Sequence, residues 1–241
     1  MAEILKSFCE DNGIVISDEQ NEKFEKLTGL LLEFNSHTNL TAIKEPDEVA
    51  VKHYADSIAP LAFDIIPKGA RVCDIGCGAG FPGLPLCIMR DDISLTFVDS
   101  TAKKLRFTKS AIDGLGLGEQ RTECLAVRAE ELVAQTGRRE GYDVVVSRAV
   151  AALPVLCELC IPFVKRGGIF IAYKASGAPE ELKAAKKAIA TLGGVVHDIK
   201  SIELPECKGE PQPRTLIIIR KEKQTPAKFP RSYAKIVKSP L

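Results

Sequence analysis

The chain has 241 residues, of which 45% are hydrophobic and 27% charged, a composition that supports a sizeable core and argues against a disordered chain. No apolar stretch approaches the roughly 18 residues of a membrane-spanning helix, and the N-terminus lacks the basic and apolar regions of a secretion signal, so we expect a cytoplasmic protein with no membrane partner. The net charge of +1 is unevenly divided, because residues 220–241 carry seven basic residues and one acid, which favours a polyanionic partner.

The first 66 residues predict helices without intervening strands. Ser17 and Gln20 form a capping-box signal, and apolar residues then recur at helical spacing from Phe24 to Phe34. Pro46 opens a further helical stretch, in which His53 is expected to be a hydrogen-bonded packing residue. We therefore predict an N-terminal helical extension over residues 1–66.

Between residues 67 and 220, strand and helix patterns alternate, which predicts a parallel sheet covered by helices on both faces. The last two strands have no crossover helix between them and are expected to pair antiparallel. The predicted fold is α/β and Rossmann-like, the class I methyltransferase variant, with a seven-stranded, mostly parallel sheet and an antiparallel last strand. The expected strands are 71–75, 94–99, 121–127, 142–147, 168–173, 195–204 and 215–219, and the expected helices are 82–90, 102–114, 129–136, 153–164 and 179–192.

Residues 71–83 run from an apolar strand into a turn with three alternating glycines, Gly76, Gly78 and Gly80, and then into an apolar helix face. Glycines let the backbone bend sharply here and let a ligand lie against it. The spacing of Gly78, Gly80 and Gly83 also matches the phosphate-binding pattern of dinucleotide enzymes. The turn therefore predicts a nucleotide cofactor, which is either a dinucleotide or S-adenosylmethionine.

Two acids near this turn bear on the choice of cofactor. Asp74 precedes the first glycine by two residues, where a carboxylate would repel a pyrophosphate but hold the ammonium of an amino-acid cofactor, directly or through water. Asp99 ends the next predicted strand, where a carboxylate accepts the ribose hydroxyls of either cofactor. Asp74 thus favours S-adenosylmethionine, and an NAD-dependent oxidoreductase is the alternative.

The eight cysteines stand mostly in apolar surroundings, which predicts reduced thiols in the core. Cys157 and Cys160 have the spacing of a metal or redox pair, but no second pair is near them and residues 153–164 are predicted to form a buried helix. We therefore predict no metal site.

Residues 221–241 are predicted to form a basic C-terminal arm. Prolines at 226, 230 and 240 disfavour a continuous helix, so we expect an extended arm that becomes ordered on RNA. Phe229 and Tyr233 are candidates either for stacking on unpaired bases or for anchoring the arm to the core. Truncation after Gln224 is expected to weaken RNA binding and to leave cofactor affinity unchanged.

Motifs along nearly the whole chain carry a more specific signal. Phe-Pro-Gly directly after the glycine turn, together with Ser-Arg-Ala on the fourth strand, is rarer than the turn itself. The motifs are Asn39-Leu40-Thr41, Val51-Lys52-His53, Asp56-Ser57, Asp74 to Gly83, Val98-Asp99-Ser100, Lys104, Arg106-Phe107, Arg128-Ala129-Glu130-Glu131, Ser147-Arg148-Ala149 and Lys174. With them the sequence resembles the family of bacterial ribosomal small-subunit methyltransferase G, also called glucose-inhibited division protein B. It departs at Cys77, where relatives often have a small hydroxylated residue.

The resemblance implies a methyl transfer from S-adenosylmethionine to N7 of a guanine in the 530 loop of 16S ribosomal RNA, in the small ribosomal subunit or its RNA. By matching position it also implies that Gly76, Phe81, Ala129, Glu130 and Arg148 contact the cofactor. Together with the residue patterns, the expected cofactor-binding set is Asp74, Gly76, Gly78, Gly80, Phe81, Asp99, Ala129, Glu130 and Arg148.

The chemistry of this reaction asks for orientation more than for proton transfer. Guanine N7 presents an unshared lone pair, so no general base is required, and the alignment of nucleophile, methyl carbon and sulfur matters most. We expect Arg148, Arg128 and Lys174 to act as positioning residues beside the cofactor or a flipped nucleotide. A nonenzymatic RNA-binding protein with the same fold is a second alternative, and a monomer is expected.

Overall fold

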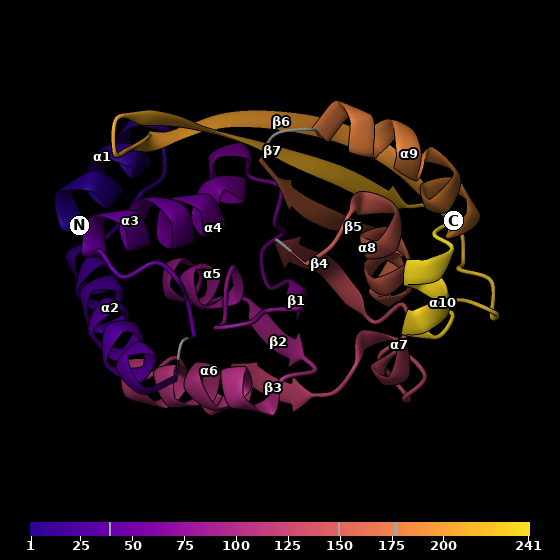
Figure 1. Cartoon of the computed structure of the whole chain (residues 1–241), viewed down its shortest axis with the longest axis horizontal. Helices are drawn as coiled ribbons and strands as arrows, with labels where there is room; N and C mark the ends of the chain where they lie inside the picture. The colour runs from indigo at the N-terminus through magenta and orange to yellow at the C-terminus, as the bar shows by residue number, and fades with distance from the viewer. Residues whose placement is uncertain (39, 149, 176–177) are drawn as a thin grey trace.

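The computed structural model describes residues 1–38, 40–148, 150–175 and 178–241. Its centre is a seven-stranded sheet in the order β3-β2-β1-β4-β5-β7-β6 (Figure 1). The five strands β1 to β5 pair parallel with one another, and β7 pairs antiparallel with both β5 and β6. The predicted mostly parallel sheet with an antiparallel last strand is confirmed. The strands are β1 (Arg71–Ile75), β2 (Ser94–Asp99), β3 (Thr122–Ala126), β4 (Tyr142–Arg148), β5 (Val164–Lys174), β6 (Gly194–Cys207) and β7 (Glu210–Lys221).

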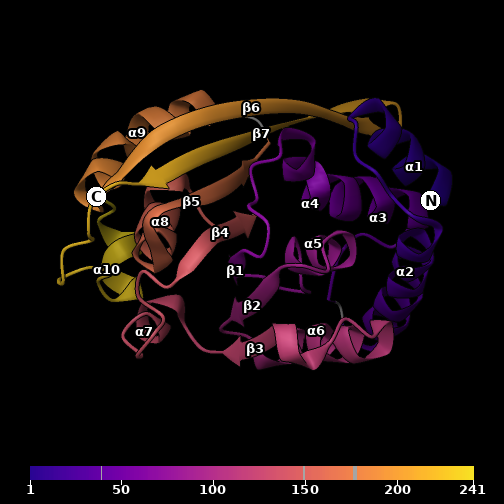
Figure 2. The same ribbon diagram turned by 180° about the vertical axis from the view of Figure 1, so that it is seen from behind.

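Helices cover both faces of the sheet (Figures 1 and 2). One face carries α1 (Ala2–Asp11), α2 (Asp18–Thr38), α3 (Pro46–Val49), a π-helical segment (Ala50–Ala55), α4 (Asp56–Ile58), a 3₁₀ segment (Ala59–Phe63), α5 (Gly83–Met89) and α6 (Ala102–Leu115). The other face carries α7 (Ala129–Leu132), α8 (Leu153–Cys160), α9 (Ala178–Thr191) and α10 (Tyr233–Lys238). Two further 3₁₀ segments are Glu119–Arg121 and Ile161–Phe163. Among the helices in these ranges, none is long and apolar enough to cross a membrane.

The central strands divide their side chains between two apolar cores. In β4, Val144 and Val146 face the core shared with the N-terminal helices, whereas Val145 faces the core under α8 and α9. All three are fully buried, as expected for a strand whose side chains alternate between two covered faces. The near-continuous apolar runs in the sequence follow from this double burial.

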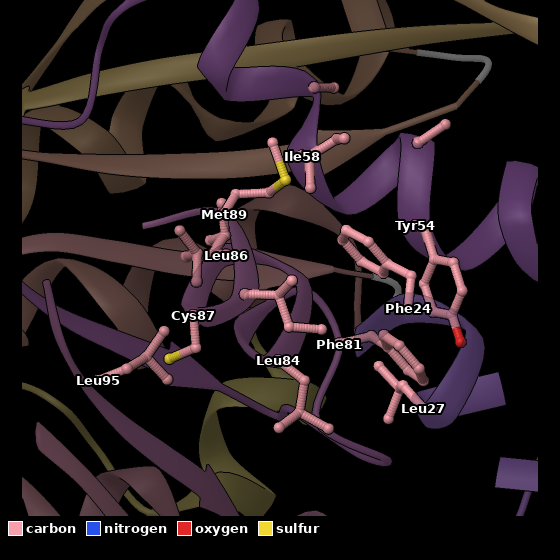
Figure 3. Packing of buried hydrophobic residues seen from close by; sticks show 14 of the residues in the cluster. Phe24, Leu27, Tyr54, Ile58, Phe81, Leu84, Leu86, Cys87, Met89 and Leu95 are labelled. Atoms are coloured by element: carbon pink, nitrogen blue, oxygen red, sulfur yellow. The ribbon is translucent and has the colours of Figure 1, made fainter. Parts of the chain in front are cut away.

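The N-terminal helices pack onto the glycine turn. The predicted capping box at the start of α2 is confirmed, because the Ser17 N–H donates to Gln20 Oε1 (2.8 Å) and the Gln20 N–H donates to Ser17 Oγ (3.2 Å). Farther along α2, Phe24 lies 4.8 Å from the Tyr54 ring, and Phe81 of the turn lies beside both (Figure 3). The helical extension therefore forms one core with α5 and α6, and it packs against Phe81 of the glycine turn.

Several element boundaries differ from the prediction: α7 ends at Leu132 rather than at residue 136, and β5 begins at Val164 rather than at residue 168. The continuous helix expected over 153–164 is wrong, because α8 ends at Cys160 and a 3₁₀ turn leads into β5; Pro162 has no N–H with which to continue the helix. The β6–β7 hairpin is longer than predicted and closes through Lys208 and Gly209, both with positive φ. Pro213 is tolerated in it because β7 pairs with β5 only from Thr215 onward.

The C-terminal tail does not form the extended arm that we expected. In both views α10 lies beside α8 (Figures 1 and 2). Phe229 and Ile236 are buried in the core under α8 and α9. Anchoring to the core, the alternative for Phe229, is therefore confirmed. Lys221 is buried and donates to Glu140 Oε1 (2.9 Å). The prolines prevent one continuous helix, but the apolar residues between them are sufficient to dock the tail.

Candidate active site

A cavity of about 390 Å³ opens at the carboxyl ends of β1, β2 and β3, and we call it the first cavity. Ligands bind at this edge of open α/β sheets, and the volume is within the range of about 300 to 1,000 Å³ that is usual for ligand pockets. Gly76 and Asp99 line it from the strand ends, and Arg128, Ala129 and Glu130 line it from the start of α7. Leu159 of α8 and Tyr233 of α10 complete one wall.

The glycine turn at the rim of this cavity has left-handed backbone geometry. Gly76, Gly78 and Gly80 have φ values of +74°, +55° and +84°. A Cβ atom on Gly76 would come within 2.4 Å of Val150 Cγ2, whereas one on Gly78 would meet no described atom within 4 Å. Gly76 is therefore required by close packing, and Gly78 by the backbone conformation beside open space in which a ligand can lie.

Asp99 ties the end of β2 to the turn. Its Oδ2 accepts the N–H of Gly78 (3.0 Å), and its Oδ1 accepts the N–H of Thr101 (2.7 Å). A carboxylate has about four lone-pair positions, so two remain for hydroxyl donors. The backbone bonds thus fix the carboxylate in the cavity wall without using up its capacity as an acceptor.

Asp74 lies beneath the turn and is fully buried. Its Oδ2 accepts the N–H of Gly83 (2.9 Å) at the start of α5, and its Oδ1 has no hydrogen-bond partner among the residues that the structure describes. Burial raises the pKa of Asp74 to about 7, since a charged carboxylate is poorly solvated here, and the Gly83 hydrogen bond and Arg148 offset only part of that effect. An unpaired buried carboxylate oxygen is an acceptor that an ammonium group or a bridging water would satisfy.

A second cavity, of about 440 Å³, lies between the π-helical segment and the ends of β4 and β5. Arg148, at the end of β4, lines this cavity rather than the first. Its Nη1 donates to the carbonyl oxygen of Lys52 (2.8 Å) and to Asp56 Oδ2 (3.0 Å). Arg214 Nε is 3.2 Å from the other oxygen of Asp56, in an ion pair without hydrogen-bond geometry. Arg148 thus joins the sheet to the N-terminal helices.

His53 occupies the centre of this arrangement. Its ring stacks on Phe81 with centroids 4.4 Å apart and an angle of 4° between the planes. Arg148 Nη2 donates to His53 Nδ1 (3.2 Å), and because arginine can only donate, the proton of the neutral ring is on Nε2, 3.2 Å from Thr41 Oγ1. Burial, with the charge of Arg148 as a second cause, lowers the pKa of His53 to about 3. The prediction of a hydrogen-bonded packing residue is confirmed.

Lys174, at the end of β5, also lines the second cavity. Its Nζ donates to Glu181 Oε2 (2.7 Å) and to the carbonyl oxygen of Ala151 (3.0 Å). Arg128 is on the opposite side of the turn, in the first cavity, and its guanidinium carbon lies 5.0 Å from the centre of the Tyr233 ring. The three expected positioning residues are therefore divided, with Arg148 and Lys174 in one cavity and Arg128 in the other.

Of the nine expected cofactor-binding residues, four line the first cavity and Arg148 lines the second, whereas Asp74, Gly78, Gly80 and Phe81 are outside the lining of both. Gly76, Asp99, Ala129 and Glu130 line the first cavity, while Phe81 is buried under the turn against His53. Nine lining residues were not among the predicted site residues, and they are Ile75, Val98, Ser100, Thr101, Lys104, Val127, Val150, Leu159 and Tyr233. The position of Val150 just after a strand end was a usable signal, whereas nothing in the sequence places Tyr233 there. Asn39 and Ala149, which belong to the motifs above, lie outside the described residues.

The first cavity fits the nucleoside of S-adenosylmethionine. It offers a carboxylate with free lone pairs at the end of β2, the glycine turn at its rim through Gly76, and apolar walls from Val98, Val127 and Leu159. The unpaired oxygen of Asp74 beneath the same turn suits the amino-acid end of such a ligand better than it suits a pyrophosphate.

Comparisons with known proteins agree with this geometry. Two solved structures have similar folds: a putative transferase from Pyrococcus horikoshii (TM-score 0.55, 13% identity, 70% of this chain and 64% of that one) and an O-methyltransferase dependent on S-adenosylmethionine from Thermotoga maritima (TM-score 0.52, 15% identity, 81% and 72%). Identities this low show the fold alone, which is that of class I methyltransferases.

Sequence relatives are much more similar. Proteins named ribosomal RNA small subunit methyltransferase G are 42% identical in Geobacillus thermodenitrificans, over 98% of both chains, and 45% identical in Bacillus pumilus, over 96% of this chain and 95% of that one. The model of the GidB family, described as rRNA small subunit methyltransferase G, matches residues 20–208. The chain therefore belongs to the rRNA small subunit methyltransferase G family.

Proposed function

We propose that the protein transfers a methyl group from S-adenosylmethionine to N7 of a guanine in the 530 loop of 16S ribosomal RNA. Family membership supports methylation of small-subunit ribosomal RNA. The observation that carries the cofactor is the first cavity, in which Asp99 and the glycine turn meet. The position of the methyl group on the guanine rests on the resemblance of the motifs, and it is the part that an experiment must establish.

In this proposal the residues that line the first cavity and those of the adjoining glycine turn have distinct tasks. Asp99 accepts the ribose hydroxyls, and Ala129 and Glu130 line the end of the cavity that follows β3. Gly78 leaves room for the backbone to approach the amino-acid end, and Asp74 accepts from its ammonium through a bridging group. S-adenosylmethionine supplies an electrophilic methyl group on its sulfonium sulfur.

The second cavity is where the target nucleotide is expected to bind. It is lined by four basic side chains, Lys52, Arg148, Lys174 and Arg214, with two acids among them. This excess of positive charge suits a phosphate-linked nucleotide. His53, whose pKa is lowered to about 3 by burial, remains neutral near pH 7 and adds no charge to this cavity. Since guanine N7 needs no deprotonation, these side chains would orient the base and its phosphates rather than remove a proton.

Methyl transfer from labelled S-adenosylmethionine is the direct test. We expect label in deproteinised 16S RNA or in small ribosomal subunits, and mass spectrometry of RNA from cells with and without the gene should place one methyl on a guanine of the 530 loop. A methyl at another nucleotide would overturn the assigned target. Binding of the RNA without any transfer would favour a nonenzymatic RNA-binding protein, and binding of NAD in place of S-adenosylmethionine would favour an oxidoreductase.

A further inference from the structure

The C-terminal tail reaches the first cavity, although it follows the last strand of the sheet. Tyr233, the first residue of α10, forms part of the cavity wall, and the guanidinium of Arg128 lies over its ring at 5.0 Å. Both side chains are partly exposed, Tyr233 to 38%. An arginine held over a tyrosine ring gains cation–π attraction, so each side chain restricts the other at the cavity mouth.

Buried contacts fix the place of Tyr233. Two residues earlier in the chain, Arg231 donates through Nε to Glu158 Oε1 (2.8 Å), and its backbone N–H donates to the same oxygen (2.8 Å). Glu158 is fully buried in α8, whose next residue, Leu159, lines the cavity. A buried carboxylate needs such a partner, so this ion pair holds the tail against the helix.

Arg139 provides a second anchor for the tail. Arg139 Nη1 donates to the carbonyl oxygen of Phe229 (2.8 Å), and Nη2 donates to that of Thr225 (2.8 Å). Ile236, one turn after Tyr233, is fully buried in the core under α8. The tail is thus anchored before and after Tyr233, which keeps this residue at the cavity wall.

We infer that Tyr233 is a cofactor-binding residue, and that the C-terminal tail closes the nucleoside end of the cofactor site by holding Arg128 in place. This inference rests on the proposed function of the first cavity. The nucleoside end follows from the topology. Arg128 comes after β3, which is next to β2 and its Asp99, whereas the glycine turn after β1 faces the amino-acid end. The inference predicts the opposite of the sequence-based expectation, in which truncation after Gln224 leaves cofactor affinity unchanged.

Calorimetric titration with S-adenosylhomocysteine and with 5′-methylthioadenosine, which lacks the amino-acid end, tests the inference on the full chain. Tyr233→Ala should weaken the binding of both ligands by about three- to tenfold, because the aromatic ring and its cation–π contact with Arg128 are lost. Tyr233→Phe should bind both ligands like wild type, because the ring remains. Val237→Ala is the matched control, because Val237 is on the same short helix, is 51% exposed and is outside the cavity lining.

The possible results distinguish a failure of the role assigned to the tail from a failure of the proposed function. Equal affinities for wild type and Tyr233→Ala, with circular dichroism showing both folded, would overturn the role of the tail and leave the proposed function intact. A loss confined to S-adenosylhomocysteine would overturn the assignment to the nucleoside end. If wild type binds neither ligand, the proposed function itself fails.

Discussion

Arg148 Nη2 donates to Nδ1 of the buried His53, and this contact joins burial in favouring the neutral imidazole. A second proton on the ring would have to point at a guanidinium that has no lone pair to receive it. The burial of His53 is the larger part of the cost of charging it. The contact between the sheet and the N-terminal helices is therefore sensitive to acid.

The first prediction concerns this sensitivity. Because the pKa of His53 is lowered from 6.5 to about 3, the unfolded chain takes up a proton below pH 6.5 while the folded chain does not. The free energy of unfolding should then fall by at most about 1.4 kcal/mol per pH unit between pH 6 and 4 on account of this residue. His53→Gln cannot be protonated, so its deficit in stability relative to wild type should shrink over that range.

Urea unfolding at pH 7, 6, 5 and 4 measures the effect. The control is His197→Gln, because His197 is exposed on β6. Its free energy of unfolding, plotted against pH, should stay parallel to that of wild type. If the curve of His53→Gln is parallel as well, the pKa of the folded-state histidine is not depressed.

The second prediction concerns the fit between α5 and the sheet. A Cβ atom on Gly83 would come within 2.3 Å of Phe97 Cε1 and 2.9 Å of Asp74 Oδ2. Although alanine favours helices, Gly83→Ala should destabilise the protein by about 1 to 3 kcal/mol, as overpacked cores do. In contrast, Gly29→Ala on the exposed side of α2, where a Cβ atom meets no described atom within 4 Å, should stabilise it by up to about 1 kcal/mol. Thermal unfolding of both variants decides the matter, and equal melting temperatures would show that the clash is relieved.

The glycine turn and Gly83 show which features the sequence predicts and which it does not. Alternating glycines after an apolar strand predict a turn beside a ligand, because only glycine adopts that backbone readily. The same pattern does not reveal that Gly83 is required by an aromatic ring on the neighbouring strand, since Phe97 is fourteen residues away in the chain. The parallel strands and the antiparallel last strand were predictable from the alternation of strands and helices, whereas the end of α8 at Cys160 was not, because one proline outweighs an otherwise apolar helical run.

The third prediction concerns Asp99. If its two remaining lone pairs accept ribose hydroxyls, Asp99→Ala should weaken S-adenosylhomocysteine by about 1 to 3 kcal/mol, because charged hydrogen bonds are lost and the hydroxyls remain poorly satisfied. Glu131→Ala, at an exposed acid of α7, is a control of equal charge. Calorimetry on both variants, after circular dichroism has shown them folded, gives the comparison. An affinity of Asp99→Ala within twofold of wild type would make Asp99 a purely structural anchor of the turn.

The candidate site was less predictable than the fold, and the reason is long-range packing. Motif position assigned Arg148 to the cofactor, but here its guanidinium contacts Asp56 and His53, which come from helices almost a hundred residues earlier. Tyr233 shows the opposite error, since a proline-interrupted basic tail resembles an unstructured arm. Its role depends on Glu158, a buried acid in an apolar helix whose partner is found only after folding.

The last prediction concerns RNA binding by the tail. Arg231 is held in its ion pair with Glu158, so of the basic residues after Gln224 the three exposed lysines, Lys228, Lys235 and Lys238, are the ones available to phosphates. Changing all three to glutamine avoids truncation, which would also remove Tyr233. If each lysine meets one phosphate of unpaired RNA, the affinity should fall and the slope of log affinity against log salt should flatten by about 2, at roughly 0.7 per contact.

The matched control for this variant changes Lys183, Lys186 and Lys187, three exposed lysines on α9, to glutamine. It removes the same charge from the same face of the sheet, so a slope that flattens equally in both variants would reflect net charge rather than contacts by the tail. S-adenosylhomocysteine affinity should be unchanged in the tail variant, because these lysines are outside the lining of the first cavity. An unaltered salt slope would remove the tail from the RNA surface, and would leave the basic second cavity around Arg148 as the place where the RNA is bound.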